Sequence, residues 1–467
     1  MKEAIEQNPE RMQYRIVRGH IYLEMKKYKE ALEEYQAAAE DYRDAPELYY
    51  NRGCTYEGLR ETEAAITDFK KTLELNDRYR NTNVKLFNIY RKKYGDRNRR
   101  EDFEQALFYI NKQLEIRETS ADYFRRALIY FDITDIEKSL ADYEKSLELD
   151  PDDYVTYSNM GYCYQADRQF EKAIEYFQKS KVLMERKNEN TRPYSQSGMC
   201  YKAMQRYDEA LECFLEGAEI FPEEKDYPFW KQIGYVYEAK GEYDKAIKAL
   251  ENMKGISDDY YHAIAEAWIE SGNPEKGLKI LTDRIKEAPE DKKAMHYNEL
   301  GDCYYDLLEY HKAAESYTEA ISLENDPEEL YEYEKSLAKT YYLMGEYKKA
   351  KEHAQKAFDH FYEIGWVEED YVSFKAYAPV RIGSIGWLYL CLGDKDKAEE
   401  SFRRMNEIHL CRYCTRDKCF ESSLWLGRFY ETQGDYKRAI EHLEEALRRN
   451  PELIQAQNAL ENLRRKL

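Results

Sequence analysis

A small residue returns along this chain at intervals close to 34 residues, each time within an apolar, helix-like segment. The successive spacings are 34, 34, 40, 34, 37, 36, 31, 36, 37, 48 and 41 residues. The positions, glycine or alanine in all cases but one, are Gly19, Gly53, Phe87, Ala127, Gly161, Gly198, Gly234, Ala265, Gly301, Ala338, Gly386 and Gly427. A chain of 467 residues is too long for one compact domain, and this period predicts that it extends by repeating one structural unit about twelve times.

Each unit contains two stretches of about a dozen residues in which apolar side chains recur three or four apart, as in amphipathic helices. Gly241, Gly345 and Gly434 fall between the two stretches, where a glycine ends a helix. Pro151 and Pro289 fall between units, where proline prevents a helix from continuing. No single pair of helices buries its apolar face alone, so we expect an all-α fold of stacked antiparallel helix pairs.

The unit at residues 154–187 carries a nearly full set of characteristic large and small residues. These are Tyr157, Met160, Gly161, Tyr164, Phe170, Ala173 and Phe177. Their arrangement resembles the tetratricopeptide repeat pattern W-x2-L-G-x2-Y, followed by A-x3-F and a proline. The resemblance covers essentially the whole chain. It implies a right-handed superhelical solenoid whose concave groove binds a protein or a peptide.

The domain organisation follows from where the repeat pattern begins and ends. We expect residues 1–11 to be the remnant of a preceding repeat, residues 12–453 to form about twelve repeats in one continuous array, and residues 454–467 to form a capping helix. The opening inside a repeat favours a fragment of a longer, bacterial protein. An incomplete first repeat also leaves pairing with a second copy open, so the oligomeric state is not determined by the sequence.

Charge and cysteine usage narrow the class of partner and the compartment. The chain has 72 Lys and Arg against 92 Asp and Glu, a net charge of −20, which disfavours nucleic acid as a main partner. There is no apolar run of the roughly 18 residues that a membrane span needs, and no signal peptide pattern. Nine cysteines, an odd number and mostly isolated within helical patterns, predict free thiols and a cytoplasmic location.

The first helix of each repeat lines the groove in proteins of this family, and its second, fifth, ninth, twelfth and thirteenth positions face the ligand. Transferred to this chain, these positions give an aromatic lining: Tyr50, Phe124, Phe131, Tyr162, Tyr235, Tyr305, Tyr342 and Trp387. In the eighth and ninth repeats the lining becomes acidic: Asp259, Glu266, Glu270, Asp302 and Asp306. Carboxylates one helical turn apart repel unless a cation relieves them, so we predict a protein or peptide partner with a basic segment. An ordinary solvated acidic face is the alternative.

A cluster of metal-ligand residue types lies between the last two repeats. His409, Cys411, Cys414 and Cys419 give the spacing H-x-C-x2-C-x4-C. Thiolate and imidazole are the ligands of tetrahedral structural zinc, so we predict a structural zinc site there. Three reduced thiols without metal are the alternative. We expect no other cofactor to be required.

The sequence contains none of the common catalytic motifs. A phosphate-binding G-x4-G-K-[ST], a dinucleotide-binding G-x-G-x2-G, an H-E-x2-H and a G-x-S-x-G are all absent. We therefore predict a non-catalytic binding scaffold. The alternative is a peptide-sensing regulatory or co-chaperone module whose effector domain is missing from this chain. The family's clamp for C-terminal carboxylates is not recognisable, because Ile16 and His20 stand where the clamp has Lys and Asn.

Overall fold

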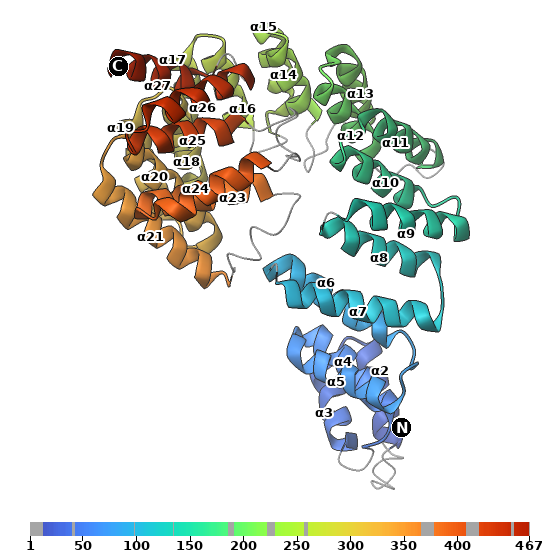
Figure 1. Ribbon diagram of the computed structural model, residues 1–467. Coiled ribbons are helices and arrows are strands. Elements are labelled where there is room, and N and C mark those ends of the chain that lie inside the picture. The colour runs from blue at the N-terminus through green and yellow to red at the C-terminus, as the bar shows by residue number, and fades with distance from the viewer. Residues whose placement is uncertain are drawn as a thin grey trace. The chain divides into compact units, whose positions relative to one another are not determined.

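The computed structural model describes residues 13–39, 43–97, 99–133, 135–184, 191–221, 229–255, 260–365, 378–407, 420–449 and 453–466. Over these residues the regular secondary structure is helical throughout, and successive helices form antiparallel pairs (Figure 1). The predicted all-α solenoid of antiparallel helix pairs is therefore confirmed. The chain divides into two compact units: unit 1 comprises residues 1–131 and 137–151, and unit 2 comprises residues 132–136 and 152–467.

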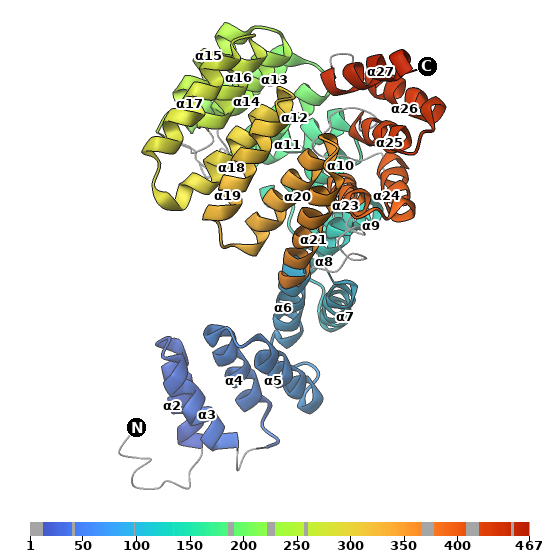
Figure 2. The ribbon, with the colours of Figure 1, turned by 90° about the vertical axis from the view of Figure 1, so that its left-hand side faces the viewer.

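Unit 1 contains four helix pairs. The first helices of the pairs are α2 (Gln13–Glu24), α4 (Pro46–Leu59), α6 (Thr82–Arg97) and α8 (Ser120–Asp132). The second helices are α3 (Tyr28–Ala39), α5 (Thr62–Leu75), α7 (Arg100–Ile116) and α9 (Ile136–Leu149). Helices α2, α4 and α6 each pack most extensively against the second helix of their own pair, and α3 and α5 also pack on the first helix that follows (Figure 2).

Unit 2 contains eight further pairs among the described residues. The first helices are α10 (Tyr154–Ala166), α12 (Arg192–Ala203), α14 (Phe229–Ala239), α16 (Tyr260–Glu270), α18 (Glu290–Asp306), α20 (Pro327–Leu343), α23 (Ala378–Leu392) and α25 (Phe420–Thr432). The second helices are α11 (Phe170–Met184), α13 (Tyr207–Ile220), α15 (Tyr243–Leu250), α17 (Pro274–Glu287), α19 (Tyr310–Leu323), α21 (Tyr347–Glu363), α24 (Lys395–Glu407) and α26 (Tyr436–Arg449). A short 3-10 helix, η1 (Glu251–Met253), follows α15, and the last helix, α27 (Ile454–Lys466), packs against α25 and α26. The expected domain boundaries stay a prediction, and residues 1–11 lie outside the described residues.

The recurring glycine has a direct steric cause. In eight repeats a Cβ atom at the glycine would meet a large side chain sixteen residues later, on the second helix of the same pair. The pairs are Gly19–Tyr35, Gly53–Phe69, Gly161–Phe177, Gly198–Phe214, Gly234–Leu250, Gly301–Tyr317, Gly386–Phe402 and Gly427–Leu443. The glycine thus lets the large side chain lie against the helix backbone, which explains the period in the sequence.

We expect Gly161→Ala to lower the free energy of unfolding by about 1–3 kcal/mol, because the added methyl group overfills the contact. Its Cβ would lie 2.5 Å from Cε1 of Phe177, a ring that is fully buried. Urea unfolding measures the change. Gly95→Ala is the control: its Cβ would meet nothing within 4 Å, so it should not destabilise the protein, and the higher helix propensity of alanine should raise stability by up to about 1 kcal/mol. Equal effects in the two variants would contradict the steric explanation.

The turns between paired helices use a left-handed residue, as the glycines in the sequence predicted. Gly241, Gly345 and Gly434 have φ of 72°, 79° and 75°. Equivalent turns elsewhere place a residue other than glycine in the same region: Lys26, Arg60, Arg168, Gln205 and Leu308. These five turns carry no glycine signal in the sequence, and the packing of the helix pair imposes their conformation.

Unit 1 adds a buried ion pair to the same helix–helix contact. In three repeats an arginine directly before the small residue bonds the acidic residue directly before the large one: Arg18–Glu34, Arg52–Asp68 and Arg126–Asp142. Arg126 donates from Nε and Nη2 to the two carboxylate oxygens of Asp142, each at 2.7 Å, and from Nη1 to Asn111 Oδ1 at 2.9 Å. The Asp142 side chain is only 7% exposed. Each pair therefore links the two helices of one repeat at a nearly buried position.

The structure also bears on two further expectations, free cysteine thiols and the absence of a membrane-spanning helix, within the residues that it describes. The six described cysteines, Cys54, Cys163, Cys200, Cys213, Cys303 and Cys391, are free thiols. No described helix combines the length and the apolar character that crossing a membrane requires.

Candidate protein-binding surface

The first helices of neighbouring repeats in unit 2 lie next to one another. Helix α10 contacts α12, α14 contacts α16, α16 contacts α18, and α20 contacts α23, more extensively than any two second helices of the described chain contact each other. In a solenoid the more closely spaced row forms the inner side of the curve. We call the exposed and half-buried side chains of this row the inner surface.

Five carboxyl groups from three successive first helices gather on the inner surface. Glu238 comes from α14, Glu266 and Glu270 from α16, and Asp302 and Asp306 from α18. We call these five residues the acidic cluster. They act on one another electrostatically: Glu270 and Glu266 act on Glu238, and Glu266 acts on Asp302 and Asp306. The cluster therefore spans three repeats.

Asp302 is tied to the core of its own repeat. Tyr317, the large side chain that packs on Gly301, donates its hydroxyl proton to Asp302 Oδ1 at 2.7 Å. Asn298 donates to Oδ2 at 3.4 Å. Burial raises the pKa of Asp302, and the bond from Tyr317 together with His262 and Lys339 opposes that rise. The carboxyl group is thus fixed in place by the same ring that packs the helix pair.

Glu238 is the most strongly perturbed carboxyl group of the acidic cluster. Burial, followed by repulsion from Glu270 and Glu266, raises its pKa to about 8, and Lys202 partly opposes the shift. Its Oε1 atom is buried and has no hydrogen-bond partner. Burial in turn lowers the pKa of the Lys202 ammonium, against the pull of Glu238. A large part of the Glu238 population is therefore protonated at neutral pH.

Asp306 is the second carboxyl group of the acidic cluster with a clearly raised pKa, which is about 6. Restricted hydration raises it first, then repulsion from Asp302 and from Glu266, while Lys339 and His262 oppose the rise. Its surface is nevertheless exposed to water. The side chain therefore remains accessible to a partner while protein surrounds much of it.

Lys339 on α20 lies between the acidic cluster and a group of aromatic rings. Its Nζ atom is 4.6 Å from the ring centroids of Tyr305 and Trp425 and 5.8 Å from that of Trp387. The Trp387 and Trp425 rings meet edge to face at 4.2 Å. The ammonium of Lys339 thus contacts three rings and also acts on Asp302 and Asp306.

The predicted aromatic lining is more buried than the sequence indicated. Tyr50, Tyr305, Tyr342 and Trp387 are between 5% and 9% exposed, and Trp387 packs edge to face on Tyr342 at 5.8 Å. The half-buried members are Phe124, Phe131, Tyr162 and Tyr235, and Lys202 and Lys231 lie over the Tyr235 ring at 5.2 and 5.9 Å. Many rings of the expected lining therefore serve mainly to pack the helices within and between repeats.

Four ionisable residues in or near the acidic cluster were not predicted, although the repeat register marks their positions. Glu238 and Lys202 stand four residues after their repeat's small residue, Lys339 stands one after it and His262 three before it. The same offsets select the predicted residues Tyr305, Asp302 and Phe124. Trp425 follows none of these offsets, so only the structure places it beside Lys339.

Several predicted residues lie outside the described residues: Asp259, His409, Cys411, Cys414 and Cys419. The zinc site therefore stays a prediction. Within the described ranges, no group of three or more His, Cys, Asp or Glu side chains is arranged to hold a metal ion.

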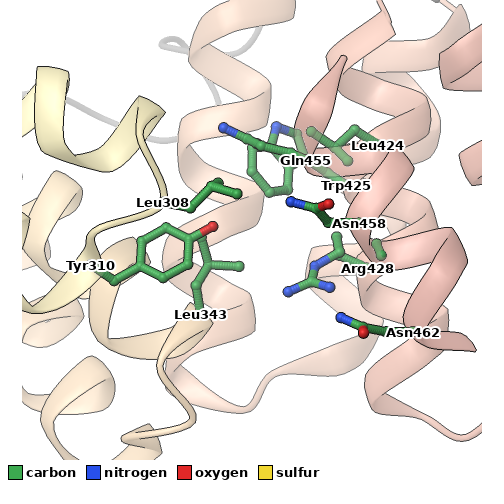
Figure 3. Close-up of a pocket in the computed structure, with 10 residues that line it drawn as sticks. Leu308, Tyr310, Leu343, Leu424, Trp425, Arg428, Gln455, Asn458 and Asn462 are labelled. Carbon is green, nitrogen blue, oxygen red and sulfur yellow. The ribbon is translucent and has the colours of Figure 1, made fainter. Parts of the chain in front are cut away.

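A cavity of about 270 Å³ borders the same region on the side of α25 and α27 (Figure 3). Leu308, Tyr310 and Leu343 face Arg428, Asn458 and Asn462 across it. Arg428 is paired with Glu431 at 2.8 Å. Trp425 also lines this cavity, so open space adjoins the aromatic group around Lys339.

Stacked helix pairs with an inner row of first helices define the class of α-helical solenoid repeat proteins. Family models for the tetratricopeptide repeat match residues 19–59, 46–79, 120–153, 152–223, 227–256, 297–327 and 420–461, together more than half of the chain. The chain belongs to the tetratricopeptide repeat family, whose members generally mediate protein–protein interactions.

Curated relatives match parts of the chain. Tetratricopeptide repeat protein 16 of Homo sapiens is 27% identical over 164 residues, which is 32% of this chain and 19% of that protein. Hsp70-Hsp90 organizing protein 1 of Glycine max is 28% identical over 253 residues, which is 50% of this chain and 41% of that protein. The chain thus spans about a fifth and about two fifths of the length of these relatives.

Solved structures with similar repeats include YrrB, described as a TPR protein with an unusual peptide-binding site. It is 18% identical, with a TM-score of 0.35, and the match covers 44% of this chain and 97% of YrrB. The Cut9–Hcn1 assembly of the APC/C is 16% identical, with a TM-score of 0.36, and the match covers 96% of this chain and 83% of that chain. These similarities concern the repeat architecture alone.

Proposed function

We propose that this protein is a non-catalytic scaffold whose inner surface binds a partner protein or peptide, and that the acidic cluster receives a Lys- or Arg-bearing segment of that partner. The observation that carries the proposal is the convergence of five carboxyl groups from α14, α16 and α18, with the pKa of Glu238 and of Asp306 raised. Crowded carboxylates are costly in the free protein. A basic segment relieves that repulsion on binding, which favours it over a neutral or acidic one.

The free cysteines of the described residues support a reducing, cytoplasmic compartment as part of this proposal. A peptide-sensing regulatory or co-chaperone module is the second candidate, favoured by the similarity to the soybean Hsp70-Hsp90 organizing protein. The positions occupied by Ile16 and His20 count against a carboxylate clamp in the first repeat.

The test is fluorescence anisotropy with three labelled twelve-residue peptides, in which serine alternates with lysine, glutamate or glycine. We expect the lysine peptide to bind most tightly and its affinity to fall as salt is added. Glu266→Gln/Asp306→Asn should weaken its binding about tenfold, because each lost charge removes roughly 1 kcal/mol or less of attraction at contact distance in water.

Glu315→Gln/Glu319→Gln is the matched control, since it removes two exposed carboxylates from the second helix α19 and should leave the affinity nearly unchanged. Equal binding of the lysine and glutamate peptides, or equal losses in the two double variants, would count against the acidic cluster as the binding site. Binding of the glutamate peptide alone would favour a clamp-like co-chaperone mode instead.

A further inference from the structure

We propose that Tyr305, Trp387 and Trp425 form a cation subsite directly beneath the inner surface. Lys339 fills this subsite in the free protein, and a lysine or arginine side chain of the partner enters it when Lys339 moves out. This inference rests on the proposed function and adds the residue that limits access to its binding site.

The three rings come from three different helices, α18, α23 and α25, and each is between 5% and 7% exposed. Trp387 is also held edge to face by Phe402 at 6.1 Å and by Tyr342. The rings are therefore fixed by packing before any ligand arrives. A preformed group of aromatic faces attracts an ammonium or guanidinium ion through the ring quadrupoles, and it does so more strongly where water is excluded.

Lys339 makes contacts that another cation can reproduce. Its Nζ atom meets ring faces at 4.6 Å and is attracted by Asp302 and Asp306. Neither kind of interaction requires the fixed geometry of a bidentate arginine pair. A partner ammonium that takes the same place regains most of the same energy. The long, flexible stem of Lys339 lets its head group move into water.

The other described lysines that lie over an aromatic ring are each placed over a single ring. Lys349 is 4.9 Å from the Tyr341 centroid and bonded to Glu346, and Lys397 is 4.6 Å from Tyr389. Lys339 differs because three rings and two carboxyl groups converge on it. The cavity of about 270 Å³ that borders Trp425 adds open space beside the subsite for the side chain that carries the incoming cation.

The first experiment compares the lysine–serine peptide on the wild-type protein and on Lys339→Met, which keeps the apolar stem and vacates the head-group position. We expect three- to tenfold tighter binding by Lys339→Met and no change in the control Lys349→Met, which removes a single-ring lysine from the second helix α21. Lys339→Met/Trp425→Leu should lose the gain. A double variant that keeps it would show that only the charge of Lys339 matters, which overturns the proposal.

A second experiment does not depend on any peptide. Tetramethylammonium chloride is titrated into each variant while tryptophan fluorescence is recorded, with sodium chloride as the reference salt. We expect saturable quenching in Lys339→Met, weaker quenching in the wild type and none in Lys339→Met/Trp425→Leu. Lys339→Gln provides a second opening of the subsite if Lys339→Met melts early.

The outcomes separate the two proposals. Quenching in Lys339→Met without binding of the lysine peptide to any variant would leave the cation subsite standing and overturn the basic-segment function. Binding of the lysine peptide to the wild type that depends on Glu266 and Asp306, together with no gain and no quenching in Lys339→Met, would overturn the subsite and leave the function standing. If the lysine peptide does not bind the wild type, and Lys339→Met shows neither a gain in affinity nor quenching, both the cation subsite and the basic-segment function are overturned.

Discussion

Replacing Arg126 with methionine should lower the free energy of unfolding by about 3 kcal/mol, the largest stability effect that we expect from a single change in unit 1. The substitution keeps most of the side-chain volume but leaves the Asp142 carboxylate, 7% exposed, without its bidentate partner. Asn111 loses its donor as well. A charge left alone at such a position costs more than the ion pair contributes, because water cannot replace the lost donors.

Two further variants test this explanation. Arg126→Met/Asp142→Leu should recover much of the loss, because a pair of apolar side chains leaves no buried charge behind. The control Lys145→Met lies on α9, the helix that carries Asp142. It breaks an exposed ion pair with Glu148 and should change the free energy of unfolding by less than about 0.5 kcal/mol. Urea unfolding gives the totals, and amide hydrogen exchange in α8 and α9 shows whether the loss is local. A double variant less stable than Arg126→Met would contradict this account.

The affinity for the lysine peptide should rise about 30-fold, or by about 2 kcal/mol, between pH 5.5 and pH 8.5, while the stability of the free protein falls over the same range. The pKa of Glu238 is about 8 and that of Asp306 about 6, so both carboxyl groups are largely neutral at the lower pH. Raising the pH charges them and strengthens the attraction to the lysine side chains. Lys202, Glu266 and Glu270 surround Glu238 and set this response.

The opposite trend in stability follows from the direction of the same shift. The ordinary pKa of a glutamate carboxyl is 4.5, and the fold raises that of Glu238 to about 8. Between these values the folded state binds a proton that the unfolded state has lost, so the free energy of unfolding decreases as the pH rises. We expect a decrease on the order of 2 kcal/mol, because water near the half-buried carboxyl restores part of its hydration.

Glu238→Gln should weaken both pH trends. Its free energy of unfolding at pH 8.5 should exceed that of the wild type, and the pH dependence of its peptide affinity should shrink to the part that Asp306 supplies. Glu319→Gln, which removes an exposed carboxyl of α19, should follow the wild-type curves. If the stabilities of the wild type and of Glu238→Gln had the same dependence on pH between 5.5 and 8.5, Glu238 would be charged throughout that range, which contradicts this account.

The repeat could be predicted from the sequence because its physical cause is local. The contact between Gly161 and Phe177 joins residues sixteen apart in one helix pair, so it leaves a fixed spacing in the chain. The same local rule placed Glu266, Asp302 and Asp306 on first helices, where the structure has them. It also marked the positions of Glu238 and Lys339, which were not predicted because single charged residues are common on helix surfaces.

The sequence by itself determined the helix pairs, their number among the described residues and the order in which their first helices follow one another, because these depend on contacts within one repeat and on turn chemistry. The tertiary structure alone decided how buried each inner side chain is and which charges meet across repeats. Trp425 approaches Lys339 from α25, although α21, α23 and α24 lie between their helices in the chain. The burial and repulsion that raise the pKa of Glu238 likewise depend on how α14 and α16 pack together. Such encounters depend on small rotations between successive repeats, and a spacing pattern within one repeat carries no record of them.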